Sequence, residues 1–244
     1  MELTINKLSG YGIFLLSIIL SILIIRELRT AVMATSWEAP KKAGIANRIV
    51  LFIFGWLFYL GIVSLSGITS TFDTIPPRMV LLVILPALII ILFLIFSGRT
   101  DQMLKHLSPR FLIMIQFFRV FVELLIWLAF TSNLLPVQMT FEGRNLDIIA
   151  GATAPVAASF LMRNGKLNRQ LILWWNIGGL VLLANIVGIA ILSFPTPIRF
   201  FLNDPSSTIV TTFPWIYLPG TLVVTAYSCH ALSLRQLYLM SKKG

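Results

Sequence analysis

The feature that most constrains this chain is a series of seven apolar runs, each close to the length of a membrane-spanning helix. A span needs about 20 mostly apolar residues, because the hydrocarbon core is about 30 Å thick and a helix rises about 1.5 Å per residue. The runs cover residues 8–25, 49–68, 79–96, 111–130, 146–162, 171–194 and 213–232. The sequence therefore predicts an all-α integral membrane protein, in which residues 1–244 form one domain of seven transmembrane helices.

The composition agrees with this prediction and excludes several other classes of protein. Hydrophobic residues make up 57% of the chain, and only 11% of its residues are charged. An average soluble domain has roughly 25% charged residues. The loops between the runs are too short for a folded domain outside the membrane. A soluble enzyme and a disordered chain are therefore excluded, and the single cysteine, Cys229, excludes a disulfide scaffold.

The run 146–162 is the weakest of the seven, because small residues and Pro155 dominate it from Gly151 to Ser159. Small residues let helices approach closely, so we expect this segment near the centre of the bundle. The basic loop that follows, residues 163–169, supports its place in the series. Without a span at 146–162, that loop would lie on the opposite side from the other basic loops.

The distribution of basic residues predicts the orientation, because short cytoplasmic loops of membrane proteins are rich in Lys and Arg. One side of the predicted bilayer carries Arg26, Arg29, Lys41, Lys42, Arg48, Arg99, Lys105, Arg110, Arg163, Lys166, Arg169, Arg235, Lys242 and Lys243. The other side carries only Lys7, Arg78, Arg144 and Arg199. We therefore expect the N-terminus outside, the C-terminus in the cytoplasm, and a location in the plasma or inner membrane. Since topology explains the net charge of +10, no nucleic-acid partner is expected.

Polar residues inside the fourth and seventh runs are the first candidate site. Gln116, Arg119 and Glu123 are spaced three and four apart, so they share one face of a helix. Charged groups at membrane depth cost several kcal/mol and mark function by default. Arg119 and Glu123 are expected to form an ion pair, and His230 lies at about the depth of Arg119. Two interpretations stay open: a ligand-binding or proton site, and a structural pair that joins this helix to its neighbours.

A second candidate site is a charged vestibule at the outer surface. Its predicted members are Asp73, Arg78, Glu142, Arg144 and Asp147, with Arg199 and Asp204 in a neighbouring loop. Arg144 can pair with an acid or bind an anion at a helix start. The alternative is an ordinary helix start, in which Asn145 caps the helix and the acids complement its dipole.

The residue inventory disfavours several known chemistries. No lysine lies in any apolar run, so a retinal Schiff base is excluded. His106 and His230 are the only histidines, whereas a zinc hydrolase of this kind needs about three, so we expect no metal site and no cofactor. Ser64 and Ser66 lie near the outer end of the second run and His230 near the inner end of the seventh. A serine–histidine dyad is therefore disfavoured.

Three classes of function remain. The first, which we carry forward, is a transporter or small-ligand-binding protein with a polar intramembrane site on the fourth span. The second is a structural subunit or assembly partner in a membrane complex. The third is an integral-membrane enzyme acting on a lipid or another small molecule, and a catalytic role is the less favoured interpretation. The expected partners are the lipid bilayer and either a small-molecule ligand or other membrane subunits.

Overall fold

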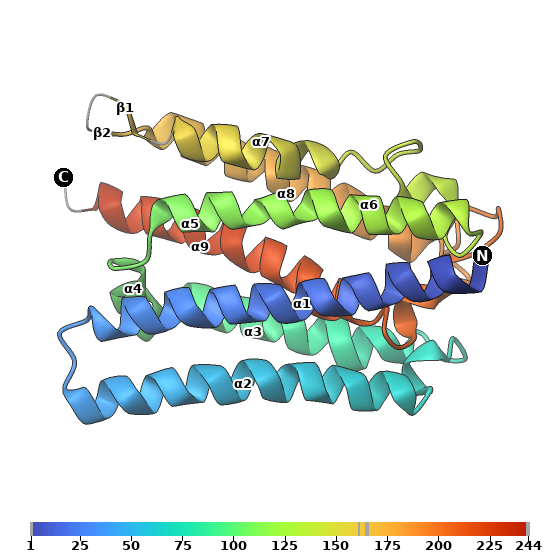
Figure 1. Ribbon diagram of the computed structural model, residues 1–244, viewed down its shortest axis with the longest axis horizontal. Coiled ribbons are helices and arrows are strands. Elements are labelled where there is room, and N and C mark those ends of the chain that lie inside the picture. Colours follow the sequence, from blue (N-terminus) through green and yellow to red (C-terminus); the bar gives the residue numbers. More distant parts are fainter. Residues whose placement is uncertain (1, 161, 164–165, 243–244) are drawn as a thin grey trace.

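In a computed structural model the chain forms a bundle of helices that lie side by side along one direction (Figure 1). The structure describes residues 2–160, 162–163 and 166–242. Parts of three sequence predictions therefore lie outside the described residues: residue 161 in the run 146–162, residues 164 and 165 in the loop after it, and Lys243 in the basic tail.

Consecutive long helices run in opposite directions through the bundle (Figure 1). The α-helices are α1 (Glu2–Met33), α2 (Ala39–Leu65), α3 (Leu85–Phe96), α4 (Gly98–Leu104), α5 (Pro109–Met114), α6 (Phe118–Thr131), α7 (Ile148–Ser159), α8 (Arg169–Leu192) and α9 (Val224–Ser241). Short 3-10 segments are η1 (Ile68–Ser70), η3 (Ile115–Phe117), η4 (Val137–Met139) and η5 (Ser207–Thr211), and π-helical turns are η2 (Val80–Ile84) and η6 (Leu218–Val223). The strands β1 (Met162–Arg163) and β2 (Lys166–Leu167) pair antiparallel between α7 and α8.

Several of these helices have the length and apolar character of membrane spans. Among the described residues, four segments qualify, and a fifth qualifies if a bent pair is one span. The four are Leu8–Met33, Ala39–Leu65, Pro109–Thr131 and Arg169–Leu192, and the pair is Val80–Phe96 with Gly98–Leu104, which meet at 68°. The prediction of a helical protein with several helices long and apolar enough to span a membrane is therefore confirmed.

The fifth and seventh predicted runs depart most from regular spans. α7 is apolar but has only 12 residues. The run 213–232 becomes helical only at Leu218, begins with a π-helical turn, and continues as α9 to Ser241. Pro214 and Pro219 lie at this start, and proline lacks the N–H that a regular helix would use there. The helix is therefore displaced toward the C-terminus relative to the apolar run.

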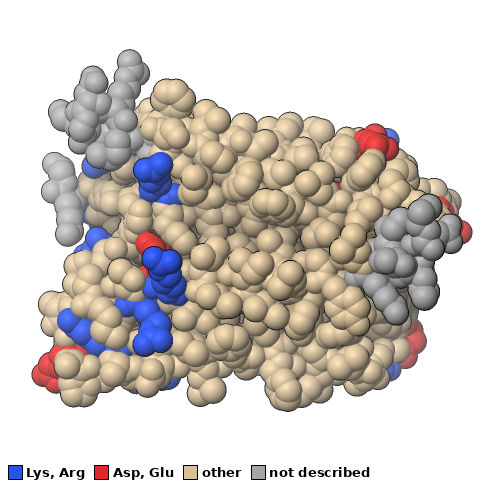
Figure 2. Space-filling model, in the orientation of Figure 1, with Lys and Arg blue, Asp and Glu red and all other residues tan. Residues whose placement is uncertain are grey.

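The surface of the bundle is apolar along its middle and charged at its ends. In the view of Figure 2, Lys and Arg gather at the end where α1 finishes and α2 begins. The broad band between the two ends shows no charged residue on this face. Large apolar side chains are exposed on the long helices; Leu51 of α2, for example, is 74% exposed. Contiguous apolar surface of this kind marks contact with a membrane or a partner rather than with water.

Candidate functional site

Seven polar residues are joined by hydrogen bonds of their side chains and of one backbone N–H inside the bundle, and we call them the central cluster. They come from α6, from the turn that starts α7, from α8 and from α9, which lie in the upper half of Figure 1. The members are Arg119, Glu123, Asn145, Asp147, Asn176, His230 and Ser233. All seven side chains are buried, and Arg119 and Glu123 are each 1% exposed.

The core of the cluster is an ion pair between α6 and the start of α7. The Nε of Arg119 donates to Oδ2 of Asp147 at 2.6 Å, and its Nη2 donates to Oδ1 of the same carboxylate. Nη2 also reaches the carbonyl oxygen of Gly179 on α8 at 3.4 Å. Asp147 stands at the N-terminal end of α7, where the helix dipole favours a negative charge. Both its partner and its position therefore stabilise Asp147 as a carboxylate.

The contacts of His230 define its protonation. Its Nε2 lies 3.0 Å from Nη1 of Arg119, and a guanidinium has only donors, so Nε2 accepts. The proton of a neutral ring then lies on Nδ1, which donates to Oδ1 of Asn176 at 2.9 Å. Asn176 in turn donates from Nδ2 to Ser233 Oγ at 3.0 Å and to the carbonyl of Ile172 at 2.7 Å. This arrangement holds His230 as a neutral imidazole.

Glu123 occupies the other end of the cluster. Both of its carboxyl oxygens lie 2.7 Å from Nδ2 of Asn145, which also donates to the carbonyl of Met139 at 2.9 Å. Oδ1 of Asn145 accepts from the backbone N–H of Asp147 at 3.0 Å. The expected ion pair between Arg119 and Glu123 is therefore wrong. Asp147 offers the guanidinium a two-oxygen contact across the helix interface, which is stronger and better oriented than an Arg-to-Glu pair along one helix.

Two glycines allow the helices to come close enough for these contacts. A Cβ at Gly151 of α7 would lie 2.8 Å from the backbone nitrogen of Val120 and 3.1 Å from Cβ of Arg119. A Cβ at Gly179 of α8 would lie 2.4 Å from Cε1 of His230. The small residues of these two helices thus serve close packing around the cluster, as the sequence predicted for the run 146–162.

Gln116 lies one turn before Arg119 and is fully buried. Its Nε2 donates to the carbonyl of Ala226 at 3.0 Å, which ties η3 to α9. Its Oε1 has no hydrogen-bond partner among the described residues. A buried acceptor without a donor costs about 1–3 kcal/mol, so this oxygen is a place where a donor would be bound favourably.

The side chains of the predicted outer vestibule do not form one group in this structure. Asp147 points into the central cluster, which corrects its place in the vestibule. Asp73 and Arg78 pair with each other at 2.9 Å. Glu142 accepts from Nε1 of Trp127 at 2.6 Å, and the guanidinium of Arg144 lies 5.5 Å from the ring centre of Phe201. No hydrogen bond or ion pair within the described ranges joins the first pair to Glu142 or Arg144.

The cluster combines carboxylates with one histidine, but it offers no metal site of ordinary composition. Among the described residues, no group of three His, Cys, Asp or Glu side chains is placed to hold a metal ion. The groups that remain for chemistry are proton donors and acceptors.

Comparison with known proteins gives a family. A family model described as a domain of unknown function, DUF8737, matches residues 76–238. The chain belongs to this family. The matched segment is about two thirds of the chain and contains every member of the central cluster and Gln116. No curated protein and no solved structure matches the chain.

Proposed function

We propose that this protein is a membrane transporter or small-ligand-binding protein whose working site is the central cluster, with one exchangeable proton on Glu123. The observation that carries the proposal is the charge count of the cluster. It contains two carboxyl groups, Glu123 and Asp147, but only one guanidinium, Arg119, and its histidine is neutral. With both acids ionised, the buried cluster would carry one uncompensated negative charge.

An uncompensated charge in an apolar interior is costly, and such a group takes up or releases a proton instead. Asp147 has both the guanidinium and a helix start to stabilise its charge. Glu123 is hydrogen-bonded only to the amide of Asn145, and it interacts with Arg119 through charge alone, without a hydrogen bond. The extra proton is therefore assigned to Glu123, and its loss or gain changes the charge of the whole cluster by one.

A site that binds and releases a proton at membrane depth is what proton-coupled carriers use. The unpartnered Oε1 of Gln116 lies one turn from Arg119 and about 10 Å along the helix from Glu123, and it supports a second ligand on the far side of Arg119 from the proton site. A small polar molecule with a hydrogen-bond donor fits the chemistry of that oxygen.

The proposal includes the finer topology predicted from the sequence. Its seven spans are α1, α2, η2 with α3, α5 with η3 and α6, α7, α8, and η6 with α9. The N-terminus is outside, the C-terminus is cytoplasmic, and the protein resides in the plasma or inner membrane. The alternating direction of successive helices and the basic character of one end support this arrangement (Figures 1 and 2).

One observation favours a second candidate, a structural subunit of a membrane complex. The buried Arg119 guanidinium makes four hydrogen bonds, to Asp147, His230 and the carbonyl of Gly179, and the cluster links α6, α7, α8 and α9. A buried ion pair with several hydrogen bonds also suits a rigid joint. In that case, gentle purification should retain other membrane proteins in fixed proportion to this chain.

Proton-driven uptake tests the transporter directly. Purified protein in liposomes is given an inward proton gradient and a panel of small polar metabolites, and their accumulation is measured. We expect at least one to accumulate with the parent protein and with Glu142→Gln, which removes an exposed carboxylate outside the cluster, but not with Glu123→Gln. Accumulation by no member of the panel, or equal accumulation by Glu123→Gln, would contradict the proposal.

A further inference from the structure

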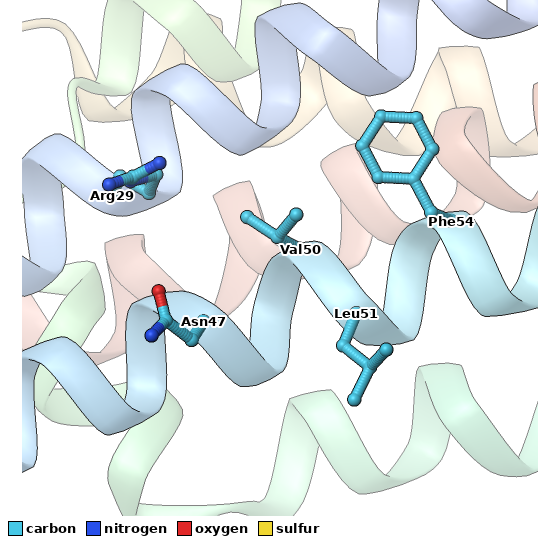
Figure 3. A pocket seen from close by; sticks show the side chains of 5 residues that line it. All are labelled: Arg29, Asn47, Val50, Leu51 and Phe54. Carbon is cyan, nitrogen blue, oxygen red and sulfur yellow. The ribbon is translucent and has the colours of Figure 1, made fainter.

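A groove lies between α1 and α2 near the basic end of the bundle (Figure 3). Its volume is about 390 Å³, and it is open to the surface rather than enclosed. The lining residues are Arg29 from α1 and Asn47, Val50, Leu51 and Phe54 from α2. The groove is separate from the central cluster, since neither α1 nor α2 contributes a residue to that cluster.

The groove has a polar end and an apolar end. Figure 3 shows Arg29 and Asn47 opposite each other at one end, with Val50, Leu51 and Phe54 following along α2. Both Arg29 and Asn47 are exposed. Neither side chain has a hydrogen-bond or ion-pair partner in the part of the chain that the structure describes. Five N–H donors of a guanidinium and two of an amide are thus available to a ligand.

The polar end coincides with the boundary of the apolar band. Residues 8–25 of α1 and 49–65 of α2 contain no charged residue, and Arg26 and Arg48 are the first charges beyond them. Asn47 and Phe54 are seven residues apart, which is about 10 Å along the helix. The groove therefore begins at headgroup level and extends about 10 Å into the hydrocarbon region.

We propose that this groove binds one anionic phospholipid, with its phosphate on Arg29 and Asn47 and an acyl chain along Val50, Leu51 and Phe54. A guanidinium matches a phosphate with two parallel hydrogen bonds, which makes arginine well suited to this headgroup. Arg26, one turn away on the same side of α1, adds positive charge. The carboxylate of Glu27 lies two positions from Arg29, on the other side of the helix. This inference does not rest on the proposed transport function.

A phospholipid fits the site better than a soluble phosphate, because three of the five lining side chains are apolar. Leu51 and Phe54 are exposed and offer no hydrogen bond to a hydrophilic ligand. Basic residues close to an anionic leaflet each contribute about 1 kcal/mol to lipid binding. The positive charge at this end thus complements the negative headgroups of that leaflet.

Native mass spectrometry of the detergent-solubilised full chain tests the proposal. The protein is titrated with phosphatidylglycerol, with phosphatidylcholine of the same acyl chains, and with glycerol 3-phosphate. We expect one phosphatidylglycerol to bind most tightly, and Arg29→Gln to weaken its binding by about fivefold or more, the factor that corresponds to about 1 kcal/mol. Val50→Trp, which fills the groove but keeps the charge, should also abolish this preference.

Arg99→Gln is the matched control, because Arg99 is an exposed arginine on α4 at the same end of the bundle and outside the groove. It should leave the affinity for phosphatidylglycerol unchanged. Equal affinity for phosphatidylglycerol and phosphatidylcholine would contradict the proposed site. An equal loss of affinity for phosphatidylglycerol in Arg29→Gln and Arg99→Gln would contradict it as well. Binding of glycerol 3-phosphate as tight as that of the lipid would overturn the role of the acyl chain. Thermal unfolding of each variant without added lipid shows whether it is folded.

Discussion

Asp147→Asn should destabilise this protein far more than Glu123→Gln, although both replace a buried acid with its neutral amide. Asp147 is the carboxylate partner of Arg119, and Arg119 is 1% exposed. Removing the charge of Asp147 leaves the buried guanidinium without its hydrogen-bonded counter-ion. Breaking a buried pair in this way costs about 3–5 kcal/mol.

Glu123→Gln has a different effect, because Glu123 contacts Asn145 and not the guanidinium. If Glu123 is protonated, a glutamine is close to its natural state, and its oxygen still accepts from Asn145. The expected cost is that of one rearranged neutral hydrogen bond, about 1 kcal/mol.

Thermal unfolding in detergent measures the difference. For a chain of this size, each kcal/mol lowers Tm by about 2–4 °C. Asp147→Asn should therefore lower Tm by on the order of 10 °C, and Glu123→Gln by no more than about 4 °C. Glu142→Gln is the control for loss of an exposed acid, and the double variant Arg119→Gln with Asp147→Asn should recover part of the loss. Two results together would refute the pairing of Arg119 with Asp147. The first is an equal, large loss of Tm in Asp147→Asn and Glu123→Gln, and the second is a recovery of Tm when Arg119→Gln is added to Glu123→Gln.

Two further predictions concern packing and topology. Gly179→Ala should lower the free energy of unfolding by about 1–3 kcal/mol, because the new Cβ would lie 2.4 Å from the ring of His230. Gly178→Ala is the control and should not lower this free energy, because a Cβ at position 178 would meet no atom within 4 Å. Equal Tm values for the two variants would contradict this packing. Ser36 lies in the exposed loop between α1 and α2. In a Cys229→Ser background, Ser36→Cys should resist an impermeant thiol reagent in intact cells and react after permeabilisation, because the loop is expected to be cytoplasmic. Labelling of this cysteine from outside would contradict the predicted orientation.

The lengths of the apolar runs were sufficient to predict a helical protein with several candidate spans, and the spacing of three polar residues predicted the inward polar face of the fourth run. Gln116, Arg119 and Glu123 share a face because of their spacing, and all three are buried as the cost of lipid-facing charge requires. His230 joins them through Arg119. The shared face of the three residues depends on one helix alone, which is the information that residue spacing contains, whereas the contact with His230 joins α6 to α9.

The partner of Arg119 could not be predicted in the same way. Asp147 lies 28 residues away and reaches Arg119 only because α7 packs closely on α6. Spacing along one helix favoured Glu123 instead, and the position of Asp147 at a helix start favoured a surface role. A signal was present in the small residues after Asp147, including Gly151, which allow close approach, but it does not specify which neighbour is approached.

Infrared spectroscopy of the carboxyl groups tests the central claim most directly. The purified protein in lipid is titrated with pH, and the carbonyl stretching band of protonated carboxylic acids is recorded. We expect such a band at neutral pH in the parent protein and in Glu142→Gln, and no such band in Glu123→Gln. In the parent protein, the intensity of the band should change with pH while the protein stays folded. A parent protein without the band, or a band that persists in Glu123→Gln, would contradict the assignment of an exchangeable proton to Glu123.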